Sequence, residues 1–450
     1  MHNVKSLSIT REQGVIAQSF SMSLINVNHS DWIDTGYYNQ VRNDEDHGKP
    51  MNSYYGLIQS GKEVVITVGY GANTNTIFTG IIDTAKTQIG DNSIIDITGR
   101  DIGKYLIDST IWCEDTTSGS EILYEITYPI DIGITEVYLT AADTNPYLYE
   151  IFIDACMRAG ISETDISVGS SPTTDFPLRI DDLNGEYFEE CTGTWDGLCK
   201  QIAKLLVANI DVDESGTITL SKVIQPDPDA WKGITLNGTT WTSIGIDIFY
   251  KDRAVESSLI VQDSTKTTTY TKDVDWEYDE TTNSIRRTSD SLITDGQSVW
   301  VYEKYVNWIF KQGQDIFDLN QWVSHDDCYG TIVATNEDED LIRSVSIGTY
   351  GDGSIVNQNK IYIEDLPELI TETQLDNWLI DKKDEMKSKY WQVEASVLPI
   401  TQLQVNDIVQ FVVYGTIGGL YKVTGFSWSW DSDNGHSCNI KGYFLSNPND

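Results

Sequence analysis

The segment that most resembles a metal site begins at Asp211. Asp211, Asp213 and Ser215 occupy the first, third and fifth positions of an EF-hand calcium loop, and a glycine follows at the sixth. The twelfth position is Lys222, where that loop requires a glutamate that binds the ion with both oxygens. The residues between are rich in threonine and isoleucine, which is typical of a strand and not of an exiting helix. The alternative interpretation is a tight hairpin turn, so we predict that Asp211, Asp213 and Ser215 bind no calcium.

Other patterns that support catalysis or metal binding are missing from the sequence. The five histidines form neither an HxH nor an HExxH pattern, and there is no GxSxG motif and no phosphate-binding P-loop. The 69 acidic residues bring carboxylates together by chance, so acidic pairs alone do not indicate a glycosidase. The 13 tryptophans and 24 tyrosines could line a sugar-binding platform, but packing between strands explains them more simply. The sequence therefore predicts no enzyme activity, no cofactor and no metal site.

A different kind of motif is formed by Gly99, Arg100 and Asp101. We expect Gly99 to let the chain turn sharply at the end of a strand, and Asp101 to cap the short helix that follows. The guanidinium of Arg100 offers a planar fork to a carboxylate or to carbonyl groups across a domain junction. We therefore predict a structural role for these three residues, with a ligand site as the less favoured alternative.

Charge and cysteine usage restrict the possible partners and the compartment. The formal net charge is −39, which disfavours sequence-reading DNA binding and attachment to an anionic membrane. The charge is compatible with two explanations: an acidic channel through which DNA slides, or simply higher solubility. The six cysteines form no CxxC pair, and no apolar run reaches the length of a signal segment or a membrane span. We therefore expect buried free thiols and a protein that is made and folded in a reducing cytoplasm.

The elements that carry these residues are predicted to be mostly strands. Two meanders with similar turns lie near the two ends of the chain, and placing Thr79-Gly80 on Thr424-Gly425 aligns them up to the closing glycines, Gly99 and Gly442. We interpret this as one β-unit used twice, the alternative being two unrelated meanders with common turn residues. The first comprises residues 62–70, 77–86 and 94–98, and the second 407–414, 420–430 and 436–445.

Three helices interrupt the strands. One starts at Asn145-Pro146 and ends at Gly160, one has Thr194 as its N-cap, and the third covers Thr371–Lys389 with Leu375, Trp378, Leu379 and Met386 facing inward. The expected fold is mainly β with an α/β insertion: two β-barrel domains, an α/β domain and a further β-rich domain. The predicted boundaries are 1–106 for the first barrel, 107–228 for the α/β domain, 229–265 for the first strands of the second barrel, 266–350 for a β-rich inserted domain, and 351–450 for a helix and the remaining strands of the second barrel.

Several of these segments together resemble a known family. The stretch SLSITREQGVIAQSFSMSL at Ser6–Leu24 resembles the opening strands of the baseplate hub proteins of contractile-tailed phages, of which the Mu-type hub and the late control protein D family are the nearest comparisons. The passage IFTGIIDT…DITGRDIGKYLID at Ile77–Asp108 is similar to the one in which their first tail-tube-like barrel ends in TGRD. The segment TWDGLCKQIAKLLVANIDVDESGTITLSKV resembles the helix and hairpin of their α/β domain. Only residues 263–345, roughly, fall outside the resemblance.

The resemblance implies a structural virion protein located in the tail baseplate and assembled in the host cytoplasm. It implies a homotrimer that joins a six-fold tail tube to a three-fold spike. Its expected partners are the tail tube protein, the spike protein, the tape-measure protein and other baseplate proteins, with DNA passing through the lumen without specific binding. The competing hypothesis is a tail-associated protein that binds or hydrolyses cell-wall polysaccharide with its aromatic residues and acidic pairs.

Overall fold

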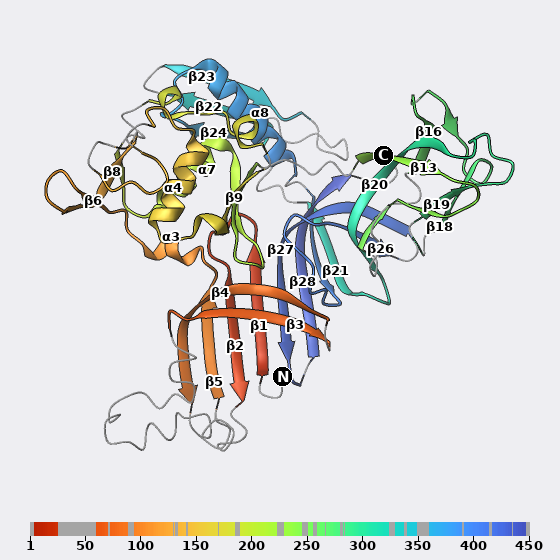
Figure 1. The fold of residues 1–450 in the computed structure, drawn as a ribbon, viewed down its shortest axis with the longest axis horizontal. Coiled ribbons are helices and arrows are strands. Elements are labelled where there is room, and N and C mark those ends of the chain that lie inside the picture. The colour runs from red at the N-terminus through yellow and green to blue at the C-terminus, as the bar shows by residue number, and fades with distance from the viewer. Residues whose placement is uncertain are drawn as a thin grey trace.

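The computed structural model describes residues 4–25, 60–70, 73–88, 94–128, 130, 134–140, 143–169, 171–184, 190–222, 229–244, 251–254, 259–265, 267–279, 282, 284–323, 329–336, 340–348, 360–388, 391–413, 416–433 and 435–446. The protein is mainly β, as predicted. Two curved, barrel-like sheets lie side by side, with the α/β domain above the first of them and a β-rich domain beyond the second (Figure 1).

The first barrel contains five antiparallel strands in the order β1-β2-β5-β4-β3. Their apolar residues alternate with polar ones, so that Leu7, Ile9, Phe20, Phe78 and Ile97 line one buried face. The strands are β1 (Val4–Glu12), β2 (Ser19–Ile25), β3 (Glu63–Tyr70), β4 (Asn73–Gln88) and β5 (Ile94–Arg100).

The second barrel repeats this arrangement with the order β21-β25-β28-β27-β26, again antiparallel throughout. The irregularities repeat as well, because β1 and β21 each have a register shift near their start, at Val4/Ser6 and at Ile316/Asp318. Such agreement in order and bulges indicates one unit used twice. The strands are β21 (Ile316–Val323), β25 (Trp391–Val397), β26 (Ile408–Val413), β27 (Thr416–Asp431) and β28 (Gly435–Ser446).

The register of the repeat differs from the predicted one. Gly99 pairs with Ile82 and Gly442 pairs with Val423, and in each long strand a register shift follows, at Asp83 and at Thr424. The two closing glycines therefore correspond as predicted, but placing Thr79-Gly80 on Thr424-Gly425 was wrong. The two Thr-Gly pairs look alike because each glycine faces a close backbone. A Cβ on Gly80 would lie 2.4 Å from the Arg100 carbonyl oxygen, and one on Gly425 would lie 2.9 Å from that of Arg11.

The two barrels share one sheet. Strand β1 of the first barrel pairs with β27 of the second, from Ser6 opposite Asp431 to Glu12 opposite Gly425. Side chains of both barrels also belong to one apolar cluster, which joins Leu7 and Phe20 to Val409 and Phe411. The relative position of the barrels is therefore fixed by backbone hydrogen bonds as well as by packing.

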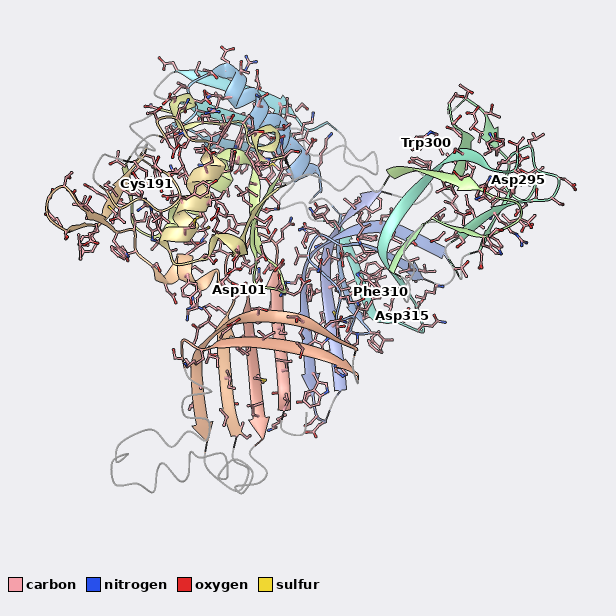
Figure 2. All side chains as sticks on the ribbon, in the orientation of Figure 1. Asp101, Cys191, Asp295, Trp300, Phe310 and Asp315 are labelled. Atoms are coloured by element: carbon pink, nitrogen blue, oxygen red, sulfur yellow. The ribbon has the colours of Figure 1, made fainter. Side chains whose placement is uncertain are left out.

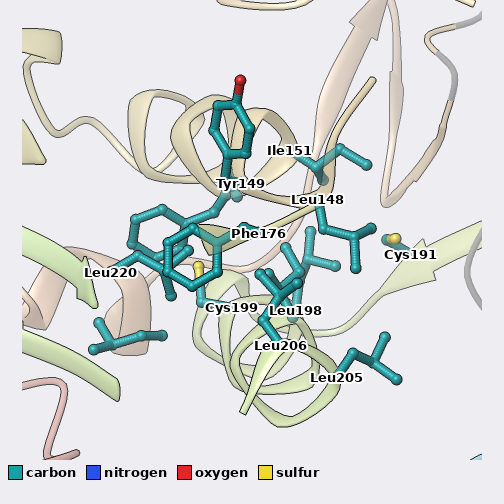
Figure 3. Close-up of a cluster of buried hydrophobic side chains, with 14 of the residues drawn as sticks. Leu148, Tyr149, Ile151, Phe176, Cys191, Leu198, Cys199, Leu205, Leu206 and Leu220 are labelled. Atoms are coloured by element: carbon teal, nitrogen blue, oxygen red, sulfur yellow. The ribbon is translucent and has the colours of Figure 1, made fainter. Parts of the chain in front are cut away.

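The α/β domain is built around two helices. Helix α4 (Leu148–Arg158) packs Leu148 and Ile151 into a buried cluster beside Leu198 and Leu205 of helix α7 (Trp195–Leu206) (Figure 3). Helix α7 begins at its predicted N-cap, Thr194, whose hydroxyl accepts the Gly197 N–H. The other elements of the α/β domain are α3 (Lys104–Asp108), β6 (Cys113–Asp115), β7 (Glu121–Leu123), β8 (Glu125–Thr127), β9 (Ile166–Val168), α5 (Pro172–Asp175), β10 (Glu190–Thr192), β11 (Ala208–Val212), β12 (Ile218–Lys222), and the short 3-10 helices Glu163–Asp165 and Ile180–Asp182.

Residues from the C-terminal half complete this same core, which the predicted boundaries did not anticipate. Helix α8 (Glu372–Ser388) buries Leu375, Trp378 and Leu379 against it, and the Trp378 indole N–H donates to the Lys204 carbonyl at 3.0 Å. Strands β22 (Thr331–Asn336) and β23 (Leu341–Ser346) lie beside α8, and β24 (Ile361–Asp365) pairs in parallel with β22. The inward face of α8 was predicted correctly, but its placement with the second barrel was wrong.

The β-rich domain surrounds its own core of Leu236, Val261, Trp276, Val299 and others. Residues 229–265 were predicted to open the second barrel, but β13 and β16 pair with the first half of β20 inside this domain. Of the described strands within 229–265, β15 alone pairs with the second half of β20. That half of β20 also pairs in parallel with β26 of the second barrel. The strands are β13 (Asp229–Leu236), β14 (Thr242–Ser243), β15 (Lys251–Ala254), β16 (Ile260–Asp263), β17 (Thr269–Tyr270), β18 (Trp276–Asp279), β19 (Ser284–Arg287) and β20 (Gln297–Lys311).

The structure bears on the predictions about cysteines and membrane-spanning segments. The cysteines of the described ranges, Cys113, Cys156, Cys191, Cys199 and Cys438, are free and buried, which confirms the prediction for these five, while Cys328 lies outside the described residues. Among the helices that the structure describes, none is long and apolar enough to cross a membrane.

Candidate interdomain junction

The EF-hand-like segment is the turn of the β11–β12 hairpin. One oxygen of Asp213, Oδ1, accepts hydrogen bonds from the backbone N–H groups of Ser215 (2.9 Å) and Thr217 (2.8 Å) and from the Ser215 hydroxyl (2.7 Å). Gly216 has a φ of 88°, a left-handed conformation that favours glycine. Lys222, at the twelfth position, forms an ion pair with Asp381 of α8 at 3.1 Å. These contacts stabilise a turn by its own side chains.

The tip of this hairpin lies between the two barrels. The Thr79 hydroxyl of the first barrel donates to the Glu214 carbonyl at 2.9 Å. On the other side, the Gln404 amide, just before β26, donates to the Glu214 carboxylate. One residue of the α/β domain therefore contacts both copies of the repeat.

Arg11 is the buried cation of this junction, with 6% of its surface exposed. Its guanidinium donates to the carbonyl groups of Ile77 at 3.1 Å and Val212 at 3.4 Å, and its Nη1 lies 3.9 Å from a Glu214 oxygen. Burial lowers the pKa of Arg11, while the negative charges of Glu214 and Asp101 act in the opposite direction. Arg11 therefore links the first barrel to the base of the hairpin.

Half-buried Asp211 of the hairpin interacts electrostatically with buried Lys422 of the second barrel. The Asp211 carboxylate accepts the Gly14 N–H at 2.9 Å, and burial raises the pKa of Asp211 although Gly14 and the charge of Lys422 lower it. Lys422 of β27 is 3% exposed, and burial lowers its pKa to about 8 against the opposing charge of Asp211. The loop after β1 meets the second barrel too, where Gln13 donates from its backbone to the Thr424 carbonyl at 2.7 Å.

Asp101 anchors the start of α3 under this loop (Figure 2). Its carboxylate accepts the Gln18 N–H and the Gly103 N–H, each at 2.9 Å. Because Asp101 is 2% exposed, burial raises its pKa to about 7 despite these two hydrogen bonds. Gly103 cannot be replaced easily, since a Cβ there would lie 1.7 Å from the Ile16 carbonyl oxygen. Asp101 was predicted to be the helix cap, but the N-cap position is Gly103; Asp101 lies two residues before it and accepts its N–H.

The other two residues of the predicted motif have different surroundings. Gly99 lies within β5 and not at a sharp turn, so that part of the prediction was wrong. Its need for glycine is steric, because a Cβ would lie 2.2 Å from the Ile81 carbonyl oxygen and 2.4 Å from the Phe20 ring. Arg100 donates through Nε to Asp83 at 2.7 Å and through Nη2 to Asp108 at 2.8 Å. These hydrogen bonds, that to Asp83 first, raise the pKa of Arg100.

Several of the predicted residues thus lie in one region, but the two buried cations of that region were not identified from the sequence. Asp101, Asp211 and Asp213 lie around the loop and hairpin that connect three domains, whereas Arg11 and Lys422 were not singled out. The position of Arg11 gave a signal, because it follows Leu7 and Ile9 on the inward face of β1. Within the described ranges, no group of three or more His, Cys, Asp or Glu side chains could hold a metal ion.

A cleft of about 400 Å³ lies between the barrels at this junction. It is lined by Ile9, Arg11 and Thr76 of the first barrel, by Gln404 and Trp428 of the second, and by Glu214. The same side chains that line it also hold the hairpin, so the cleft belongs to the contact between domains. The contacts described at this cleft hold the hairpin against both barrels and so position the domains.

The sequence matches no family model and no curated protein, whereas solved structures share the fold. The 43 kDa tail protein of prophage MuSo2 from Shewanella oneidensis superposes with a TM-score of 0.50 at 13% identity, covering 99% of this chain and 94% of that one. The tail protein from Neisseria meningitidis MC58 gives a TM-score of 0.50 at 8% identity, with the same coverage of 99% and 94%. The chain therefore has the overall fold of these two tail proteins.

Proposed function

We propose that this protein is the central hub of a contractile tail baseplate. In this role it forms a structural homotrimer that joins the six-fold tail tube to the three-fold spike. Its proposed partners are the tail tube protein, the spike protein, the tape-measure protein and other baseplate proteins. It resides in the virion tail, after assembly in the host cytoplasm, and has no enzymatic role.

The observation that carries this proposal is the duplicated five-stranded sheet. Three chains with two copies each present six similar barrels, which is what a ring that matches a six-fold tube requires. The fold shared with the two tail proteins supports the same role. The net charge of −39 fits a lumen through which DNA passes without adhering.

The interdomain junction supports an adaptor more than an enzyme. Buried Arg11 and Asp101 bind backbone groups, half-buried Asp211 accepts the Gly14 N–H, and Lys422 is buried in the second barrel. An adaptor must transmit force without a change in the angle between its barrels, and buried charged contacts across a junction resist such a change.

The test is to locate and count the chain in tail particles from the source organism. Antibody labelling should mark the end of the tail that meets the target cell, and quantitative mass spectrometry should give three copies per particle. Label along the tube, or a copy number that follows tube length, would overturn the proposal.

The competing polysaccharide role is tested on the purified chain. Incubation with peptidoglycan and soluble glycans should give neither cleavage nor retention. Robust turnover that is lost on mutation of one carboxylate pair would replace the structural proposal with an enzymatic one.

A further inference from the structure

Two strand edges of the repeat have no partner in the described part of the chain. Beyond Ile82, which bonds to the backbone of Gly61 and Lys62, the outer edge of β4 is bonded to no strand there. Among the described strands, β21 pairs with β25 alone, so its other edge has no partner within these ranges. Open strand edges are templates for pairing with another chain.

The chain itself shows what such an edge binds. In the second copy of the repeat, β27 corresponds to β4, and Val423 bonds to the backbone of Asn406 and Asp407 as Ile82 does to that of Gly61 and Lys62. Beyond that point β27 is not open, because β1 pairs with it from Gly425 to Asp431. Strand β1 is the counterpart of β21. The contact β1–β27 within the chain therefore has a missing counterpart, β21–β4.

We infer that the outer edge of β4 binds the β21 strand of a second copy of this chain, in the antiparallel register of β1 on β27. Transferring the observed pairs Arg11–Phe426, Thr10–Ser427, Ile9–Trp428 and Ser8–Ser429 through the repeat gives Val323–Ala85, Trp322–Lys86, Gln321–Thr87 and Asn320–Gln88. This inference rests on the proposed function only for the number of copies.

The side chains agree with this register. Ala85 of β4 and Leu319 of β21 pack on the shared core. Lys86 is one residue after Ala85 and Trp322 is three after Leu319, so both face outward. Lys86 then lies across from an indole that is 40% exposed in the single chain, a pairing that favours cation–π contact. Phe317 of β21, at the bulge, is 65% exposed, and a large apolar side chain on an open edge is typical of an interface.

The contact joins different surfaces of two copies and is therefore heterologous. Each chain offers a β4 edge and a β21 edge, so copies add head to tail and close into a ring when the rotation allows it. In that ring the contacts β1–β27 within a chain and β21–β4 between chains alternate. For a hub, three copies close the ring.

Cysteine cross-linking of the full chain tests the contact and its register. The variants are Lys86→Cys and Trp322→Cys, prepared singly and together, and oxidised at high salt to screen the net charge of −39. Directly opposed residues of antiparallel strands have Cα atoms about 4.5–5.5 Å apart, within the range of a disulfide. The control pairs Lys86→Cys with Asn320→Cys, because Asn320 lies two residues before Trp322 in β21 and faces the same side.

We expect a covalent dimer when the two single variants are mixed, and only monomer from either one alone. The double variant should give a ladder that ends at the closed ring, and the Asn320 control should cross-link at least five-fold less. Dimers of Lys86→Cys alone, equal cross-linking of the control, or no cross-linking at any attainable concentration would overturn the inference.

The two proposals fail separately in this design. Particles that carry three labelled copies without the β4–β21 cross-link would leave the hub standing and remove this contact. A cross-linked ring from a chain that is missing from tail particles would do the reverse.

Discussion

Replacement of Arg11 by methionine should loosen the junction between the three domains. The substitution removes hydrogen bonds from a charged donor to the Ile77 and Val212 carbonyl groups, at 3.1 and 3.4 Å. Bonds of this kind contribute about 1.5–3 kcal/mol each, and the longer one belongs at the low end. The 3.9 Å approach to Glu214, which is 32% exposed, adds about 0–1 kcal/mol. Methionine recovers apolar contact and relieves the burial of a charge, so we expect a net loss of about 2–3 kcal/mol.

The measurement must report on the junction, because a protein of several domains does not unfold in one step. Hydrogen exchange of the β11 and β12 amides gives the opening free energy of the hairpin directly, and urea unfolding followed by tryptophan fluorescence gives the global value. Arg11→Lys keeps the charge but cannot hold two carbonyl groups in a fixed fork, so its loss should be intermediate.

The matched control is Arg343→Met. Arg343 makes a bidentate contact with Asp376 of α8, at 2.8 and 2.7 Å, but 37% of its side chain is exposed. An exposed pair of this kind contributes about 1 kcal/mol or less. If Arg11→Met destabilises the protein no more than Arg343→Met does, burial of Arg11 does not hold the junction and the reasoning is refuted.

Three further predictions concern the other residues of the region. Asp101 has a folded-state pKa of about 7, above its unfolded value of 3.8, so the folded state binds more protons between those values. Stability should therefore fall as pH rises from 4 to 7, by up to about 4 kcal/mol, and Asp101→Asn should remove most of this slope in urea titrations; an unchanged slope would assign it elsewhere. Calorimetry should detect no sub-micromolar calcium site, and a site lost in Asp211→Ala would contradict this. Arg100→Ala should lower stability by only about 1 kcal/mol, because Asp83 and Asp108 are partly exposed and Lys104 still pairs with Asp83; a loss above 3 kcal/mol, or a changed oligomeric state, would count against this.

Local signals in the sequence located most elements, because they depend on neighbours along the chain. Thr194 was recognisable as an N-cap, and the apolar face of α8 followed from the spacing of Leu375, Trp378, Leu379 and Met386. An amphipathic pattern says which face is buried but not which domain covers it. This is why α8 was assigned to the barrel that follows it in the chain and not to the α/β core it completes.

The junction was harder to predict because its contacts cross hundreds of residues. Arg11 meets Val212, Gly14 meets Asp211, and β1 meets β27, and no local pattern contains these distances along the chain. The Thr-Gly pairs show the opposite failure. In both pairs the glycine faces a close backbone, but the two glycines do not occupy equivalent positions of the repeat. The short motif therefore gave a wrong alignment of the two barrels, whereas the positions of the strand bulges give the correct one.

The distribution of the inserted segments explains why the barrels hold a fixed relation. The α/β core combines residues that follow the first barrel with residues inserted between β21 and β25 of the second, so both barrels are connected to the same core. The β1–β27 ladder fixes the same relation from below, and the hairpin tip at Glu214 fixes it from the side. A change of angle between the barrels would have to break all three contacts at once, including buried charges. A hinge would place flexible loops across such a boundary, whereas this chain places the buried side chains of Arg11, Asp101 and Lys422 there, as the proposed adaptor requires.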